Sequence, residues 1–95
     1  MALFSIICRD KPGALEARMA ARADHLAYVG GYGEAVKVAG PFLSDAGEMI
    51  GSLLIMEFAD KAAAQAFVSG DPYGKAGVFA SVEILAFRVT RGQIG

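Results

Sequence analysis

The stretch MIGSLLIMEF, residues 49–58, decides the fold of this chain. In an extended strand, successive side chains point to opposite faces of the sheet. Leu54 and Met56 therefore lie on one face, while Leu53 and Ile55 lie on the other. A strand with one face in water alternates apolar and polar residues. This stretch is apolar on both faces, so it predicts a strand that is covered on both sides.

Two further apolar stretches, near the two ends of the chain, repeat this pattern. In residues 2–8, Ile6 and Ile7 point to opposite faces, and from about residue 79 to 89, Ile84 and Leu85 do the same. Two helices cover only one face of a four-stranded sheet. An exposed apolar face of that size exceeds the few hundred Å² that soluble monomers usually leave in water. Two copies that pack sheet to sheet around a two-fold axis solve this problem, so we expect a homodimer.

The segments between these strands predict two main helices and a fourth strand. The first helix starts near residue 14 and is predicted by apolar and long side chains at three- and four-residue steps, namely Leu15, Met19, Arg22, Leu26 and Val29. Gly30 and Gly31 suit its end, because glycine readily takes the left-handed conformation there. Residues 35–41 predict a strand that stops at Gly40-Pro41, and residues 44–48 predict a polar turn before the strand 49–58.

Asp60 is a favourable N-cap for a second helix at residues 61–68, and a short helical turn is expected at 73–77. The order β-α-β-β-α-β is that of the α+β ferredoxin-like arrangement. We therefore predict one domain, residues 1–95, that forms a dimer. Glu57 and Glu83 interrupt the apolar faces, and the sequence leaves open whether they mark an interface edge or line a cavity.

Composition excludes several classes of function. The formal net charge is −1 and the basic residues are scattered, whereas nucleic-acid and membrane-surface partners need clustered Lys and Arg. The single cysteine, Cys8, lies in an apolar run and is expected to be a free, buried thiol. We expect a reducing, cytoplasmic location, no secretion signal and no membrane span. One His and one Cys do not supply a usual metal site, so we expect no metal and no cofactor.

The chemistry-bearing candidates are individually weak. His25 is the only histidine, and it shares a helical face with Arg18 and Arg22. Asp71 precedes a proline in a turn, which is common turn chemistry. A Ser52-His25-Asp71 set for acyl transfer is formally allowed, but no nucleophile-elbow pattern supports it.

Taken together, these features resemble the YCII-related (YciI-like) family over nearly the whole length of the chain. The stretches that carry the resemblance are Arg22-Ala23-Asp24-His25-Leu26, Ala39-Gly40-Pro41, Gly51-Ser52, Gly70-Asp71-Pro72-Tyr73, Ala76-Gly77-Val78-Phe79 and Val82-Glu83-Ile84. The resemblance implies a dimeric α+β barrel built on the ferredoxin-like unit. It also implies a pocket with a His-Asp pair, formed here by His25 and Asp71. A dechlorinating enzyme that acts on an aromatic ring is among the relatives.

The first hypothesis is an enzyme of the lyase or isomerase type, with dechlorination among the reactions considered. Histidine, with an ordinary pKa of about 6.5, suits proton transfer near neutrality. His25 would be the acid or base, and Asp71 would fix its tautomer. Arg22 and Ser52 are expected to hold an anionic or oxygen-bearing small molecule. The substrate site is also expected to include Gly40, Pro41 and Tyr73.

Two alternatives stay open at this stage. In one, the protein is a non-catalytic module that binds a small ligand, with His25 as an anchor. In the other, the His-Asp pair is purely structural and holds the loop after the second helix against the first. The sequence does not name a substrate.

Overall fold

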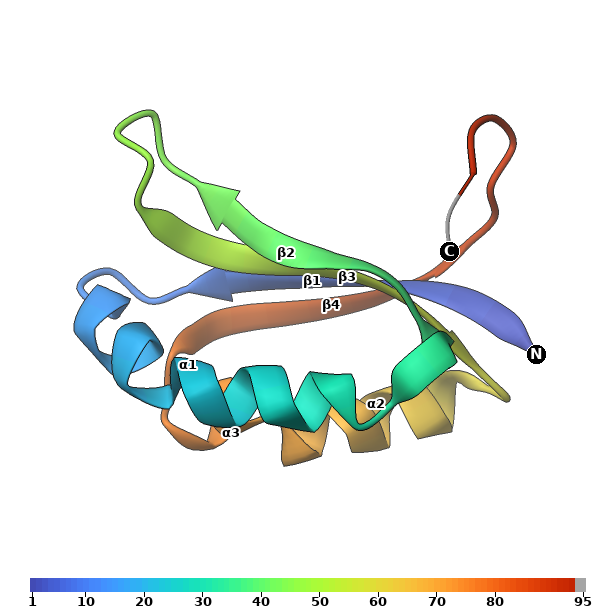
Figure 1. Cartoon of the computed structure of the whole chain (residues 1–95), viewed down its shortest axis with the longest axis horizontal. Coiled ribbons are helices and arrows are strands. Elements are labelled where there is room, and N and C mark those ends of the chain that lie inside the picture. Colours follow the sequence, from blue (N-terminus) through green and yellow to red (C-terminus); the bar gives the residue numbers. More distant parts are fainter. Residues whose placement is uncertain (94–95) are drawn as a thin grey trace.

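A four-stranded antiparallel sheet carries the helices on one of its faces (Figure 1). The computed structural model describes residues 1–93. Its elements in chain order are β1 (Ala2–Asp10), α1 (Leu15–Gly30), the 3₁₀ turn η1 (Gly33–Ala35), β2 (Val36–Leu43), β3 (Met49–Phe58), α2 (Lys61–Gly70), α3 (Pro72–Lys75) and β4 (Phe79–Phe87). The strand order is β2-β3-β1-β4. The predicted α+β ferredoxin-like fold is confirmed.

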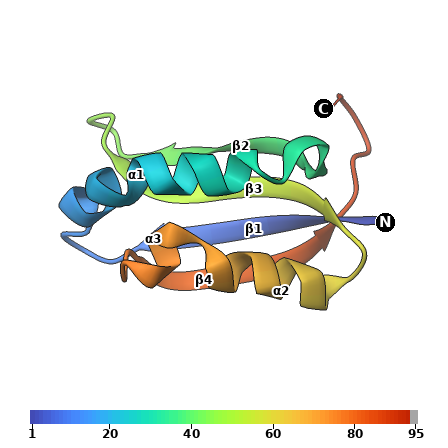
Figure 2. The same cartoon turned by 60° about the horizontal axis from the view of Figure 1, so that its bottom comes forward.

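The central strands β1 and β3 bring the apolar residues of the sheet into register. Ile6 lies opposite Leu54 on β3 and opposite Ile84 on β4. Ile6 and Met56 are fully buried beneath the helices, and Phe67 of α2 packs against the same cluster. In Figure 2, seen from the helix side, α1 runs along β2 and β3, whereas α2 and α3 lie over the β1 and β4 side. The core is therefore the layer between the sheet and the helices.

Helix α1 turns a different face to the sheet from the one that its apolar residues predict. Arg18, His25 and Val29 are buried, whereas Met19 is 53% exposed and Leu26 is 52% exposed. Met19 and Leu26, two of the residues whose spacing predicts this helix, therefore do not lie in the core. The reason is that the buried polar side chains find partners on β1 and α3, which apolar periodicity does not register.

The end of strand β2 and the glycine conformation after helix α1 also differ from the prediction. Strand β2 does not stop at Gly40-Pro41, because Pro41 pairs with Ser52 and the strand continues to Leu43. Proline is tolerated there because β2 is an edge strand, where a missing N–H costs no ladder bond. Helix α1 ends at Gly30 as expected, but Gly31 keeps a right-handed φ of −65°. The left-handed glycine of this turn is Gly33, with φ of 58°.

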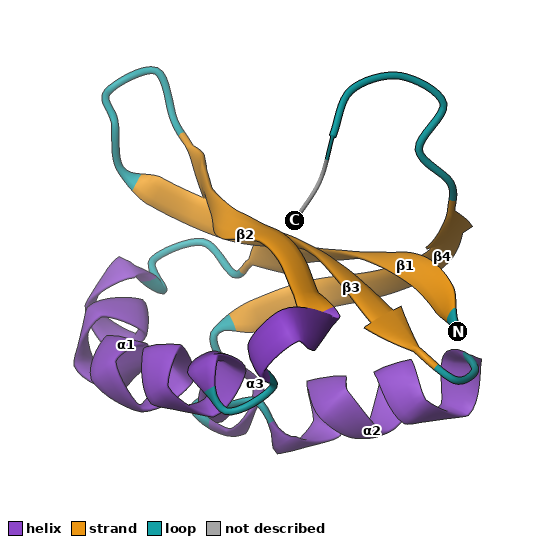
Figure 3. Ribbon diagram, turned by 45° about the vertical axis from the view of Figure 1, so that its right-hand side comes forward, coloured by secondary structure: helices purple, strands orange, loops and turns teal. Residues whose placement is uncertain are grey.

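The outer face of the sheet, opposite the helices, is also apolar. Val38, Leu85 and Phe87 are 42%, 50% and 40% exposed on it. Figures 1 and 3 show the β2–β3 hairpin and residues 88–93 rising on this side, away from the helices. Glu83 also lies here and faces Arg9 at 3.7 Å. The chain therefore carries an apolar surface between two raised arms, which are the β2–β3 hairpin and residues 88–93.

No helix in the described part of the chain is long and apolar enough to cross a lipid bilayer.

Candidate functional site

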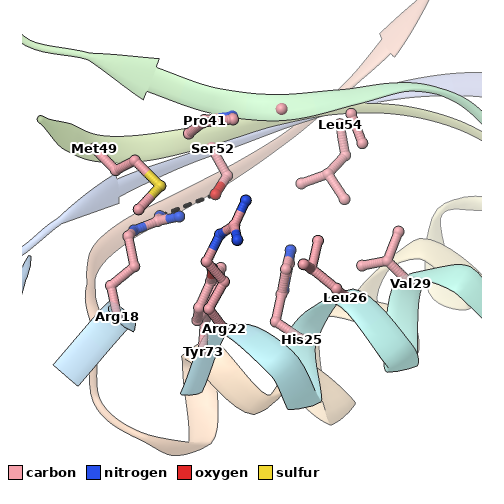
Figure 4. A pocket seen from close by; sticks show the side chains of 12 residues that line it. Arg18, Arg22, His25, Leu26, Val29, Pro41, Met49, Ser52, Leu54 and Tyr73 are labelled. Carbon is pink, nitrogen blue, oxygen red and sulfur yellow. Dashed lines mark hydrogen bonds between the residues drawn. The ribbon is translucent and has the colours of Figure 1, made fainter. Parts of the chain in front are cut away.

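A small pocket opens between α1 and the inner face of the sheet, near the edge strand β2 (Figure 4). Its cavity volume is about 80 Å³. The lining residues come from α1, β2, β3 and α3, and they are Arg18, Arg22, His25, Leu26, Val29, Ala39, Gly40, Pro41, Met49, Ser52, Leu54 and Tyr73. The polar groups are two guanidiniums, an imidazole and a serine hydroxyl, set in an otherwise largely apolar wall. Such a pocket suits a small molecule with oxygen atoms or a negative charge.

His25 and Asp71, 46 residues apart in the sequence, meet at this pocket. His25 Nδ1 lies 2.8 Å from Asp71 Oδ1, and both residues are buried. Asp71 stands at the N-terminus of α3, where its Oδ1 also accepts the backbone N–H of Tyr73 at 3.0 Å. A carboxylate oxygen only accepts hydrogen bonds, so Nδ1 carries the proton in this pair. The other ring nitrogen, Nε2, is then free to accept or give a proton.

The ring of His25 is held in place by Tyr73. The two rings stack with centroids 3.9 Å apart and planes 15° from parallel. On Tyr73, the Arg18 guanidinium carbon lies 4.3 Å from the ring centre. Burial raises the pKa of the Tyr73 hydroxyl, although Arg18 and Arg22 act in the opposite direction. Tyr73 therefore stays neutral and fixes the direction in which the imidazole points.

Arg18 forms a buried ion pair with Asp10, which sequence reasoning did not assign to the site. Its Nε and Nη2 donate to the two carboxylate oxygens of Asp10 at 2.7 and 2.8 Å. Nη2 also donates to Ser52 Oγ at 2.9 Å. Burial alone would lower the pKa of the guanidinium, but the hydrogen bonds and charge of Asp10 outweigh it and raise this pKa. The only sequence signal for this role is the spacing of seven residues that places Arg18 on the face of His25.

Cys8 lies in the core next to these ion pairs. Its thiol is 1% exposed, and burial, reinforced by the negative charge of Asp71, raises its pKa to about 12. A thiol with that pKa is protonated near neutrality and is a poor nucleophile. Cys8 therefore packs as a small residue of the core.

The structure places six of the seven sequence-predicted site residues on the pocket wall, namely Arg22, His25, Gly40, Pro41, Ser52 and Tyr73. The seventh, Asp71, lies behind His25 and reaches the pocket through it. The acyl-transfer arrangement is not formed, because Ser52 is bonded to Arg18 and makes no hydrogen bond with His25 in the described part of the chain. Glu83 faces Arg9 on the outer side of the sheet, and Glu57 does not line this pocket.

Comparison with known proteins identifies the family of this fold. The family model of the YCII-related domain matches residues 2–88. The chain belongs to the YCII-related family. A curated family member, Protein YciI of Escherichia coli O6:H1, is 34% identical over 94 residues, which cover 90% of this chain and 96% of that protein. The resemblance that the sequence motifs indicate is confirmed.

Solved structures extend this comparison. The 5-chloro-2-hydroxyhydroquinone dehydrochlorinase of Burkholderia phenoliruptrix AC1100, in complex with 2,5-dihydroxybenzoquinone, is 38% identical to this YCII-related chain. It matches with a TM-score of 0.83 over 95% of each chain. An antibiotic biosynthesis monooxygenase structure matches with a TM-score of 0.59 at 10% identity, over 96% of this chain and 100% of that one. The second similarity shows a shared fold only.

Proposed function

We propose that this protein is an acid–base enzyme that moves a proton on a small anionic or oxygen-bearing molecule, in an elimination or isomerisation. The observation that carries the proposal is the 2.8 Å contact between His25 and Asp71 at the wall of a pocket. Asp71 holds the proton on Nδ1 and leaves Nε2 as the group that exchanges a proton with the substrate. When the imidazole takes that proton, the carboxylate stabilises its positive charge.

The position of Arg22 on the pocket wall favours an anionic substrate. Arg18 is paired with Asp10, and His25 is paired with Asp71. No carboxylate in the described part of the chain lies within ion-pair distance of Arg22, which lines the same pocket. In Figure 4 the Arg22 guanidinium and a ring nitrogen of His25 both point from α1 toward the sheet. Arg22 thus places a positive charge without a carboxylate partner among the described residues beside the proton-transfer group.

The pocket volume and the dehydrochlorinase narrow the substrate class. A cavity of about 80 Å³ is smaller than the ~150 Å³ of an engineered cavity that holds benzene. It therefore takes one edge of a hydroxylated ring, with the rest of the ring at the open side. The related dehydrochlorinase was solved with such a ring compound, a dihydroxybenzoquinone. An elimination of HCl releases one proton and one chloride together, so it needs an acid–base group and no oxidant.

We also infer that the protein works as a homodimer in the cytoplasm. The apolar outer face of the sheet, with Val38, Leu85 and Phe87 exposed, supports the homodimer, because soluble monomers rarely leave such a face in water. The two raised arms that flank this face would contact the second copy on two sides. The single free thiol, Cys8, supports a reducing compartment.

The test of the catalytic proposal is chloride release from 5-chloro-2-hydroxyhydroquinone under anaerobic conditions. We expect turnover by the wild-type protein, and a loss of about 100-fold or more for His25→Ala, since general acid–base groups contribute 10²–10⁴-fold. Asp71→Asn should also lose turnover, because it removes the charge that stabilises the imidazolium. Asp45→Asn, in the exposed hairpin turn, is the matched control and should keep full activity.

Other outcomes distinguish the alternatives. Binding of 2,5-dihydroxybenzoquinone without any turnover would replace the enzyme by a non-catalytic binding module. If His25→Ala only lowered the melting temperature and kept turnover, the His-Asp pair would be structural and the proposed mechanism would be wrong.

A further inference from the structure

The hydroxyl of Ser52 has a hydrogen with no acceptor in the described part of the chain. Ser52 is 4% exposed and lines the pocket. Its Oγ accepts a hydrogen bond from Arg18 Nη2 at 2.9 Å, and no bond in which Ser52 donates is formed to a described residue. A serine hydroxyl has one hydrogen and two lone pairs. A guanidinium has no acceptor atom, so the contact with Arg18 uses a lone pair and leaves the hydrogen for another partner.

The direction of that contact is fixed by Asp10. Arg18 spans both carboxylate oxygens of Asp10, and the second hydrogen of the same Nη2 points at Ser52. Arg18 is 1% exposed and also lies against the Tyr73 ring, so its guanidinium has little freedom to turn. Ser52 Oγ therefore accepts a hydrogen bond from Arg18, and the hydroxyl hydrogen is left for a partner in the cavity. A polarised donor of this kind is stronger than an isolated hydroxyl.

We propose that Arg18, held by Asp10, is a positioning residue that makes the Ser52 hydroxyl a fixed donor for an acceptor oxygen of the ligand. The subsite lies beside Arg22 and across the pocket from His25, so one ligand oxygen is held while a neighbouring atom exchanges a proton (Figure 4). The chemical class that fits is a carboxylate, phenolate or enolate. An acceptor oxygen placed there can take hydrogen bonds from Ser52 and from Arg22, whose guanidinium has no acceptor atom. This inference rests on the proposed function for its substrate, but the oxygen subsite itself needs no catalysis.

Two probes separate the subsite from the reaction. The first is 2,5-dihydroxybenzoquinone, whose binding is measured by calorimetry. The second is formate, the smallest carboxylate, titrated while the Ser52 backbone amide is followed by NMR. Four proteins are compared, namely wild type, Ser52→Ala, Arg18→Lys and the double variant. Ser69→Ala is the matched control, because the Ser69 hydroxyl bonds the Gln65 carbonyl on an exposed part of α2.

Arg18→Lys keeps the charge that pairs with Asp10, but its ammonium stands about one bond short of the position of Nη2 and does not reach Ser52. We expect Ser52→Ala to weaken both probes about tenfold or more, as a lost hydrogen bond to a charged oxygen does. Arg18→Lys should weaken them by a comparable factor. The double variant should be no worse than Ser52→Ala, because Arg18 acts through Ser52. Ser69→Ala should bind like the wild type.

Several results would overturn the proposal. If Ser52→Ala binds both probes as tightly as the wild type, the Ser52 hydroxyl is not a donor to the ligand. If the losses in the double variant are additive, Arg18 does not act through Ser52. Absence of formate binding to the wild type means that these donors form no ligand subsite. If Arg18→Lys does not fold, Ser52→Ala alone still decides the role of the hydroxyl. Formate binding that depends on Ser52, together with no turnover of any chlorinated hydroquinone, would sink the proposed function and leave the subsite standing.

Discussion

The thiol of Cys8 makes the stability of the protein depend on pH in a calculable way. Folding raises the pKa of this thiol from 9.0 to about 12, mainly because the side chain is buried, with a further contribution from Asp71. The unfolded chain therefore loses the thiol proton first as the pH rises. Where the unfolded state binds fewer protons than the native state, stability falls with pH at about 1.36 kcal/mol per pH unit for one group. The contribution is complete below pH 9, and about 4 kcal/mol is lost by pH 12.

The comparison of wild type with Cys8→Ala isolates this effect. Urea unfolding at about pH 8, 9, 10 and 10.5 gives the free energy of unfolding of both proteins. The difference between them should shrink by about 2 kcal/mol between pH 8 and 10.5. The raised pKa values of Tyr28 and Tyr73 destabilise both proteins alike and cancel. The cost of the missing sulfur is the same at every pH. A difference that stays constant up to pH 10.5 would refute the reasoning, as would rapid reaction of the folded protein with a thiol reagent at pH 8.

Two further predictions test the packing of the helices and the outer face of the sheet. Gly70→Ala should lower the free energy of unfolding in urea by about 1–3 kcal/mol, because a Cβ there collides with the Tyr28 hydroxyl. Gly30→Ala, with no atom within 4 Å of the new Cβ, should be neutral or stabilising by up to about 1 kcal/mol. Equal losses of stability in both variants would contradict this. Leu85→Glu should convert the proposed dimer to monomers in sedimentation velocity, while Met19→Glu, similarly exposed on the helix side, should not. A monomeric wild-type protein would contradict the proposed dimer.

The strands could be predicted because their signal is local. Residues 49–58 are apolar on both faces and are bounded by a polar turn, and both features can be recognised from neighbouring residues alone. The Gly40-Pro41 boundary failed for the opposite reason. Whether a proline ends a strand depends on whether its missing N–H faces a neighbouring strand, and β2 lies at the sheet edge. That is a property of the assembled sheet, so the residues around Pro41 do not reveal it.

The candidate site also has features that the sequence predicts and features that only the assembled fold reveals. The residues alone group His25 and Asp71 only in a formally allowed set with Ser52. The family resemblance predicts the His-Asp pair, and the structure brings the two side chains to 2.8 Å. Arg18 was visible as a helix neighbour of His25, but its part depends on Asp10, at the end of β1, and on Ser52 in β3. A buried arginine is also improbable from the sequence, because charged residues are almost never fully buried unless paired. The pair becomes apparent only when the strand end and the helix are placed together.

The buried Arg18–Asp10 ion pair and the hydrogen-bonded His25–Asp71 pair explain why so many ionisable groups share one small pocket. The guanidinium carbon of Arg18 and the ring of His25 both lie against the Tyr73 ring, at 4.3 and 3.9 Å from its centre. Two uncompensated cations at that separation would each disfavour the other. Because Asp10 neutralises Arg18 and Asp71 is paired with His25, the imidazole can gain a proton without an uncompensated positive charge beside the same ring. The charge of Arg22 then remains for the substrate, so the pocket attracts an anion and still allows His25 to become cationic during proton transfer.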